Sequence, residues 1–130
     1  MIDTTLWYSG KVLPGLQLST KTGFPTVNID PAIVNKNTSE GVYACRVQYQ
    51  HTIYQGALYL GPKHIEDKNI QTLEIYIFHF NERIYDQTIS FQLKKFIRPP
   101  LPFSSLEEVR RQLTVDVNKI KRLFKENKTN

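Results

Sequence analysis

Two polar side chains that follow a proline in residues 23–29 could bind a hydrated cation or phosphate oxygens. Pro25 fixes its own φ and favours an extended conformation for the residue before it. The next residues read as a short strand, in which alternate side chains share a face, so Thr26 and Asn28 lie on the same side. A loop-like segment, residues 11–22, precedes them. We therefore expect a phosphate-bearing ligand where this loop meets the strand.

A carboxylate stands in the middle of the most apolar strand-like segment, residues 70–80. Glu74 is flanked by Leu73 and Ile75, and carboxylates are rarely placed in such a strand without a reason. An outward-facing position on a half-exposed strand would explain it without any function. The alternative is a general base with a tuned pKa.

Two further charged residues lie in the C-terminal part of the chain, one at the end of the last predicted strand and one in the predicted helix. Arg98 ends the last strand-like segment, ahead of two prolines, and could pair with a carboxylate, contact a ligand or be structural. Asp116 lies at the edge of an apolar helix stripe, where it could cap or pair locally.

Other chemistries have no support in the sequence. The Walker A pattern, Gly-x-Gly-x-x-Gly and the Gly-x-Ser-x-Gly elbow are all absent. His51, His64 and His79 have no metal-ligand spacing among themselves or with Cys45. We therefore predict neither a histidine or cysteine metal centre nor a nucleophilic hydrolase.

Most of the chain has the alternating pattern of β-strands. Gly10 within the first strand suggests a bulge or a close backbone approach, and Gly61 with Pro62 is predicted to end a strand. The predicted strands are residues 6–13, 26–29, 41–49, 53–60, 70–80 and 88–97, with loops at 30–40 and 63–69.

From Ser104 onward the apolar residues recur every three or four positions, which predicts one helix over about residues 105–125. The apolar stripe consists of Leu106, Val109, Leu113, Val117, Ile120 and Phe124. Ser104 with Glu107, or Ser105 with Glu108, provides a capping box. Strands followed by a single helix are not a βαβ pattern, and several strands are apolar on both faces. This favours a closed antiparallel barrel with a helix outside it or over one end.

The composition fits one domain over residues 1–130. The net charge of +5 suits a phosphate-bearing ligand or nucleic acid, although a solvated helix face explains most of the basic residues. The N-terminus does not resemble a signal peptide, and no apolar run is long enough to span a membrane. Cys45 is the single cysteine, so a reducing cytoplasm is expected.

Taken in order, the motifs resemble those of the riboflavin kinase family over residues 8–121. Pro25-Thr26-Val27-Asn28 differs at one position from the family's Pro-Thr-Ala-Asn. The other matching segments are Gly10-Lys11-Val12 with Gly15, Gly41-Val42-Tyr43, Leu60-Gly61-Pro62, Leu73-Glu74-Ile75-Tyr76, Tyr85-Asp86, Phe96-Ile97-Arg98-Pro99, Phe103-Ser104-Ser105-Leu106 and Asp116.

The resemblance implies a mainly β fold, a six-stranded antiparallel barrel of Greek-key type with one C-terminal helix. It also implies transfer of the ATP γ-phosphoryl group to the ribityl 5′-hydroxyl of riboflavin, giving FMN. By the same resemblance, Glu74 deprotonates the hydroxyl, and Thr26 with Asn28 holds Mg²⁺, or another divalent cation, and phosphate oxygens. The resemblance assigns Gly15 and Lys21 to the nucleotide loop, and Arg98 and Phe103 to a flap over the flavin.

Residues 16–21 depart from the family pattern, which has more glycines there and an arginine. A flavin-binding barrel without catalysis is therefore an alternative, and a small basic barrel that binds nucleic acid is another. The leading hypothesis is a stand-alone ATP-dependent riboflavin kinase, a monomer with no nucleic-acid or membrane partner. It would make FMN and not FAD, because the family's adenylyltransferase domain is not in this sequence.

Overall fold

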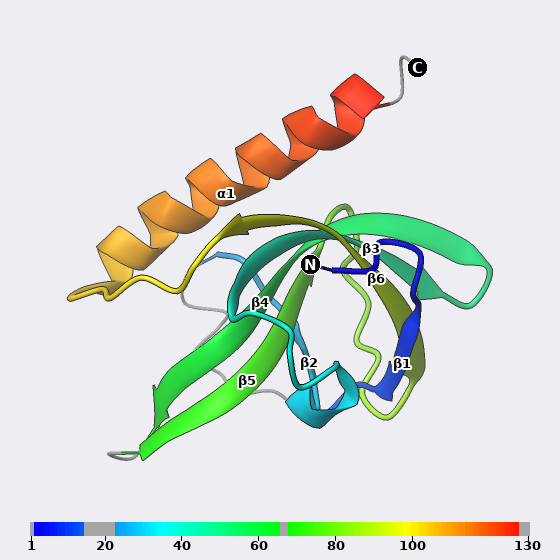
Figure 1. The fold of residues 1–130 in the computed structure, drawn as a ribbon, viewed down its shortest axis with the longest axis horizontal. Coiled ribbons are helices and arrows are strands. Elements are labelled where there is room, and N and C mark those ends of the chain that lie inside the picture. Colours follow the sequence, from blue (N-terminus) through cyan, green and yellow to red (C-terminus); the bar gives the residue numbers. More distant parts are fainter. Residues whose placement is uncertain (1, 15–22, 66–67, 128–130) are drawn as a thin grey trace.

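The computed structural model describes residues 2–14, 23–65 and 68–127. Six antiparallel strands form a nearly closed barrel, and one helix lies along its outside (Figure 1). The elements are β1 (Tyr8–Lys11), β2 (Val27–Ile29), the 3₁₀ turn η2 (Pro31–Ile33), β3 (Gly41–Tyr49), β4 (Thr52–Ile65), β5 (Lys68–Ile77), β6 (Thr88–Arg98) and α1 (Leu106–Asn127). The predicted fold, a six-stranded antiparallel barrel with one C-terminal helix, is confirmed.

The barrel closes between its first two strands. The strand order is β1-β6-β3-β4-β5-β2, so β1 and β2 stand at the two ends of the sheet. A bridge joins Leu13 to Asn28, where the Leu13 amide donates to the Asn28 carbonyl at 2.8 Å. Gly10 lies at this closure, because a Cβ there would be 2.7 Å from Cγ2 of Ile29. The predicted close approach at Gly10 is therefore confirmed.

Strand alternation divides the apolar side chains into two clusters, one on each side of the barrel wall. The interior cluster holds one set of alternating residues from β3 and β5, and the outer cluster holds the other set together with α1. The interior cluster includes Tyr43, Cys45, Val47, Leu73, Ile75 and Ile77. The outer cluster includes Val42, Ala44, Phe78, Val117, Ile120 and Phe124. The side chains of the interior cluster pack against one another inside the barrel.

The hairpin of β4 and β5 is longer than the sequence predicts. The turn predicted at Gly61-Pro62 and the loop at 63–69 are wrong, because β4 continues to Ile65 with Pro62 opposite Gln71. Within the described sheet, β3 pairs with β4 as far as Gly41 and Leu60. Beyond this point β4 runs along β5 with its other edge outside the β3 ladder, where a proline is tolerated.

The helix begins with the second of the two capping arrangements. Ser105 Oγ accepts from the Glu108 amide at 3.2 Å, and the Glu108 carboxylate accepts from the Ser104 amide at 2.8 Å and the Ser104 hydroxyl at 3.0 Å. Val117, Ile120 and Phe124 pack on the barrel, whereas Leu106 is exposed, contrary to its place in the predicted stripe. None of the described helical residues form a segment long and apolar enough to cross a membrane.

Candidate active site

Glu74 lies on the outer face of β5 and is only 8% exposed. Its neighbours Leu73 and Ile75 point into the barrel interior. In the sheet register, Asn28 of β2 stands opposite Glu74 on one side and Tyr59 of β4 on the other. The carboxylate is therefore enclosed between two strands, and a half-exposed strand position does not describe it.

Among the described residues, three side chains contact the Glu74 carboxylate. Lys63 Nζ lies 3.1 Å from Oε1, and Thr26 Oγ1 donates to the same oxygen at 3.2 Å. Thr72 Oγ1 lies 3.5 Å from Oε2. The carboxylate thus contacts residues of β4, of β5 and of the segment that leads into β2, all on the outer face of the barrel.

Thr26 and Asn28 lie beside this carboxylate because β2 pairs with β5. Val27 is opposite Ile75 and Asn28 is opposite Glu74, so Thr26 and Glu74 come together although they are far apart in the sequence. The hydroxyl, the amide and the carboxylate singled out in the sequence therefore meet on one face. Gly15 and Lys21, predicted for the nucleotide loop, lie outside the described residues.

Tyr59 completes the wall of the site on β4. Its hydroxyl donates to the Pro62 carbonyl at 2.7 Å. A Cβ on Gly61 would be 2.7 Å from that hydroxyl, so the ring needs the bare glycine beside it. Burial raises the pKa of Tyr59, and the carboxylates of Glu40 and Glu74 raise it further. The phenol therefore stays neutral and acts as a hydrogen-bond donor.

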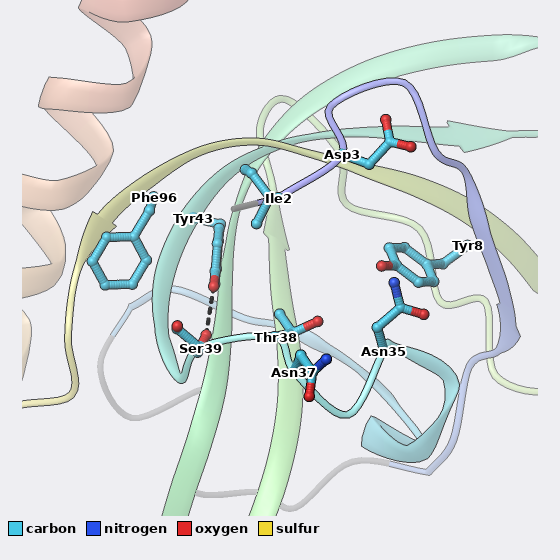
Figure 2. Close-up of a pocket in the computed structure, with 9 residues that line it drawn as sticks. All are labelled: Ile2, Asp3, Tyr8, Asn35, Asn37, Thr38, Ser39, Tyr43 and Phe96. Atoms are coloured by element: carbon cyan, nitrogen blue, oxygen red, sulfur yellow. Dashed lines mark hydrogen bonds between the residues drawn. The ribbon is translucent and has the colours of Figure 1, made fainter.

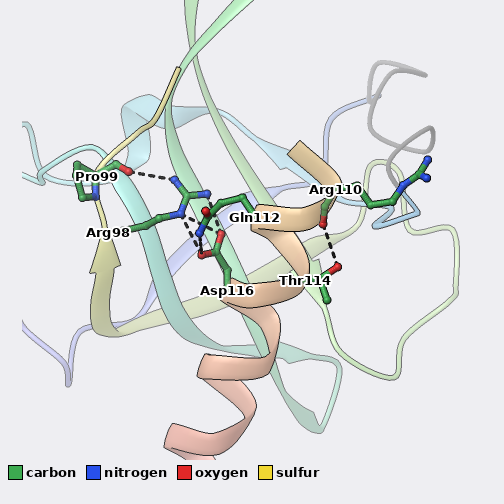
Figure 3. Close-up of polar contacts among 6 residues, drawn as sticks. All are labelled: Arg98, Pro99, Arg110, Gln112, Thr114 and Asp116. Carbon is green, nitrogen blue, oxygen red and sulfur yellow. Dashed lines mark hydrogen bonds and ion pairs between the residues drawn. The ribbon is translucent and has the colours of Figure 1, made fainter. Parts of the chain in front are cut away.

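Arg98 of β6 pairs with Asp116 of α1. It lies at the far end of the cross-strand row that contains Tyr59, because Val42 is opposite both Tyr59 and Arg98. Figure 3 shows the guanidinium between the carboxylate and the Pro99 carbonyl. The distances to the Asp116 oxygens are 2.8–3.1 Å, and Nη1 donates to the Pro99 carbonyl at 3.1 Å. Gln112 Nε2 donates to Asp116 Oδ1 at 2.9 Å. Asp116 thus pairs across elements and not only within its helix.

Phe103 lies under the guanidinium of Arg98, whose Cζ is 5.9 Å from the ring centroid. Phe103 and Leu101 in the segment that links β6 to α1 are exposed, as is Leu106 at the start of α1. The two residues predicted for the flap are therefore in contact, next to an apolar surface.

Oxygen donors make up the part of this site that could hold a cation. No group of three or more His, Cys, Asp or Glu side chains suited to a metal occurs in the described part of the chain. Magnesium, however, needs few protein ligands and is usually held by one or two carboxylates and by substrate phosphates. The hydroxyl of Thr26 and the amide oxygen of Asn28, on the face that carries Glu74, are donors of the kind that could complete such a site together with substrate phosphates.

A cavity of about 510 Å³ opens at a different part of the barrel (Figure 2). Its lining consists of Ile2, Asp3, Tyr8, Asn35, Asn37, Thr38, Ser39, Tyr43 and Phe96. None of the residues around Glu74 lines it. Size alone is a weak guide to function, so the carboxylate, the hydroxyl and the lysine that meet at Glu74 decide where the candidate site lies.

The family model for riboflavin kinase, Flavokinase, matches residues 3–124. The chain belongs to the riboflavin kinase family. The RNA-binding riboflavin kinase RibR of Bacillus subtilis is 33% identical over 117 residues, which are 89% of this chain and 50% of that protein. A bifunctional riboflavin kinase/FMN adenylyltransferase of Buchnera aphidicola is 31% identical over 121 residues, with 89% of this chain and 38% of that protein covered. This riboflavin kinase domain thus spans half or less of the length of these two relatives.

Solved structures agree on the fold. A riboflavin kinase from Trypanosoma brucei superposes with a TM-score of 0.60 at 23% identity, covering 92% of this chain and 79% of that chain. A Streptococcus pneumoniae structure described as a macrolide-efflux protein superposes with a TM-score of 0.76 at 26% identity, covering 89% and 38%. The riboflavin kinase resemblance in the motifs is confirmed by the family model, and these structures confirm the fold.

Sequence reasoning missed Lys63 and Gln112 in this riboflavin kinase domain. Lys63 falls in a segment predicted to be a charged loop, although alternation continued from Tyr59 would have put it on the face of the barrel that carries Glu74. Gln112 is one helical turn before Asp116, a spacing at which side chains meet. Gln112 contributes to the site only because its partner Asp116 pairs with Arg98, and no local sequence pattern predicts that pairing.

Proposed function

We propose that this chain transfers the γ-phosphoryl group of ATP to the 5′-hydroxyl of riboflavin, giving FMN and ADP. The observation that carries the proposal is the contact of Thr26 Oγ1 with Glu74 Oε1 at 3.2 Å. It joins the residue expected beside the phosphates to the residue expected to act as base. Membership of the riboflavin kinase family supports the same reaction.

In the proposed reaction Glu74 accepts the proton of the riboflavin hydroxyl while the hydroxyl oxygen forms a bond to the γ-phosphorus. The bond between that phosphorus and the bridging oxygen breaks, and ADP leaves. Thr26 and Asn28 would hold Mg²⁺ or another divalent cation, which neutralises charge on the phosphate oxygens when it is bound. Phosphoryl transfer depends mainly on such positioning and charge stabilisation.

We assign the flavin ring to the surface formed by Phe103, Leu101 and Leu106. These side chains are 38–52% exposed, and an aromatic ligand would cover them. The pairing of Arg98 with Asp116 would hold Phe103 in place through the guanidinium. Phe103→Ala should raise the dissociation constant for riboflavin, measured by flavin fluorescence, and leave the barrel folded.

The single thiol supports a proposal for the compartment. Cys45 is the single cysteine and is fully buried, so the chain has no second cysteine with which to form an internal disulfide. We therefore propose that the chain acts in a reducing cytoplasm, as a monomer on small-molecule substrates.

Incubation of the protein with riboflavin, ATP and Mg²⁺, followed by separation of the flavins, tests the reaction. FMN should form, and Glu74→Gln should lower its rate by ~10²–10⁴-fold, the usual contribution of a general base. Thr26→Ala should lower the rate and Thr26→Ser should retain most of it, because serine keeps the hydroxyl. Tight riboflavin binding without any FMN would instead support a flavin-binding barrel without catalysis.

A further inference from the structure

We propose that Lys63 is a positioning residue for phosphoryl transfer. It binds one oxygen of Glu74 and thereby leaves the other oxygen to accept the proton of the substrate hydroxyl. This inference rests on the proposed function, in which Glu74 is the base. It adds a third residue to the threonine and glutamate that the sequence indicated.

The sheet places Lys63 where it can do this. Lys63 stands opposite Ile70, and two residues back along β4 Gly61 stands opposite Thr72. Two residues further back Tyr59 stands opposite Glu74, so these β4 residues share the outer face with the carboxylate. From this position on the outer face the Lys63 ammonium reaches Glu74 Oε1 at 3.1 Å.

The two oxygens of Glu74 have different surroundings. Oε1 has two contacts of ordinary hydrogen-bond length, from Lys63 at 3.1 Å and from Thr26 at 3.2 Å. Oε2 has Thr72 Oγ1 at 3.5 Å, and that hydroxyl also faces the Gly61 carbonyl at 3.4 Å, although it has one proton to donate. In the described part of the site, Oε2 therefore keeps the greater capacity to accept a proton.

Burial holds the Lys63 ammonium and the Glu74 carboxylate in this arrangement. The side chains of Lys63 and Glu74 are 23% and 10% exposed, so the ammonium is partly removed from water and held against the carboxylate. A carboxylate fixed at one oxygen cannot rotate freely, and its second oxygen keeps a constant direction. Catalytic groups need this kind of support from their neighbours, and loss of such a neighbour typically lowers activity by ~10–100-fold.

The decisive comparison uses steady-state kinetics of Lys63→Met and Lys63→Arg, with Lys95→Met, an exposed lysine on β6, as the matched control. Lys63→Met should lower kcat by ~10–100-fold while the KM for riboflavin changes by less than about twofold. Lys63→Arg should restore most of kcat, because it keeps a cation at Oε1. Lys95→Met should behave as wild type. Unchanged kcat in Lys63→Met would overturn the proposal.

A double variant separates positioning from direct contact with phosphate. If Lys63 acts through Glu74, Lys63→Met should have little further effect in a Glu74→Gln background. Multiplicative losses would show that Lys63 acts on the phosphates itself and would overturn the positioning role. If Lys63→Met does not fold, Lys63→Gln carries the same two tests. Failure of wild type to make FMN would reject the proposed function, whereas loss in Glu74→Gln with full activity in Lys63→Met rejects this inference alone.

Discussion

Arg98 at the end of β6 holds Asp116 in the middle of α1 through Nε and Nη2, with Nη2 2.8 Å from Oδ2. The side chain of Asp116 is 2% exposed and that of Arg98 is 14% exposed. The pair therefore anchors the helix to the last strand at a point that water barely reaches.

Removal of one partner should be strongly destabilising. Asp116→Asn should lower the free energy of unfolding by about 3 kcal/mol, because it leaves the Arg98 guanidinium buried without its counter-charge. Urea denaturation followed by circular dichroism measures this change. Glu107→Gln removes a carboxylate from exposed pairs with Arg110 and Arg111 on the same helix and should change stability by less than about 0.5 kcal/mol. Equal effects of the two substitutions would contradict the structural role of the Arg98 pair.

Gly41 should not tolerate a side chain. Its φ is +152°, and a Cβ there would lie 2.2 Å from the Arg98 carbonyl oxygen. Gly41→Ala should therefore cost about 3 kcal/mol or more, since backbone atoms of two strands must move apart. Gly23, with φ +83°, has no described atom within 4 Å of such a Cβ, so Gly23→Ala should cost only the conformational strain of about 1–2 kcal/mol. Thermal unfolding of both variants should rank them in this order, and the reverse order would contradict the close approach at Gly41.

The thiol of Cys45 should be unreactive in the folded protein. It lies in the barrel interior with no exposed surface, and burial raises its pKa, so the thiol remains protonated at neutral pH. A chromogenic disulfide reagent should label it only as urea unfolds the barrel. Labelling at the rate of a free thiol without denaturant would show that the interior opens much more readily than the packing of β3 indicates.

The cap of α1 should depend on pH. Hydrogen bonds from the Ser104 amide and hydroxyl lower the pKa of Glu108 below its ordinary value of 4.5. Because the native pKa is the lower one, the carboxylate stabilises the fold above pH 4.5 and this contribution is lost as the pH falls through the native pKa. The melting temperatures of wild type and Glu108→Gln should therefore converge as the pH falls below 4.5 and through the native pKa. A difference that stays constant with pH would contradict the cap, and Glu82→Gln on an exposed loop controls for loss of a carboxylate.

Local pattern was enough to predict which residues of one strand share a face. Alternation separates Tyr43 from Val42 in β3 and Ile75 from Glu74 in β5, and spacing of three or four residues predicts α1. These predictions hold because a strand or helix must direct side chains in this way wherever it packs.

Pairing between distant strands could not be predicted from such patterns. The meeting of Thr26 with Glu74 requires β2 to join β5, which is set by closure of the whole barrel, and only the family resemblance pointed to it. The hairpin beyond Leu60 was missed because Pro62 was read as a turn, although it lies where one edge of β4 is outside the β3 ladder. The same misreading of Pro62 placed Lys63 in a loop and not on the strand.

The interior cluster and the polar residues around Glu74 lie on opposite sides of the barrel wall, so mutations on the two sides should affect different properties. Inward-facing residues such as Phe91 and Leu58 are buried in the interior cluster, whereas the polar side chains around Glu74 lie on the outer face. Substitutions in the interior should therefore be assessed by melting temperature, and substitutions among the outer polar residues by turnover. Heat tolerance and substrate preference could then be altered separately, by mutation of different residues in the same strands.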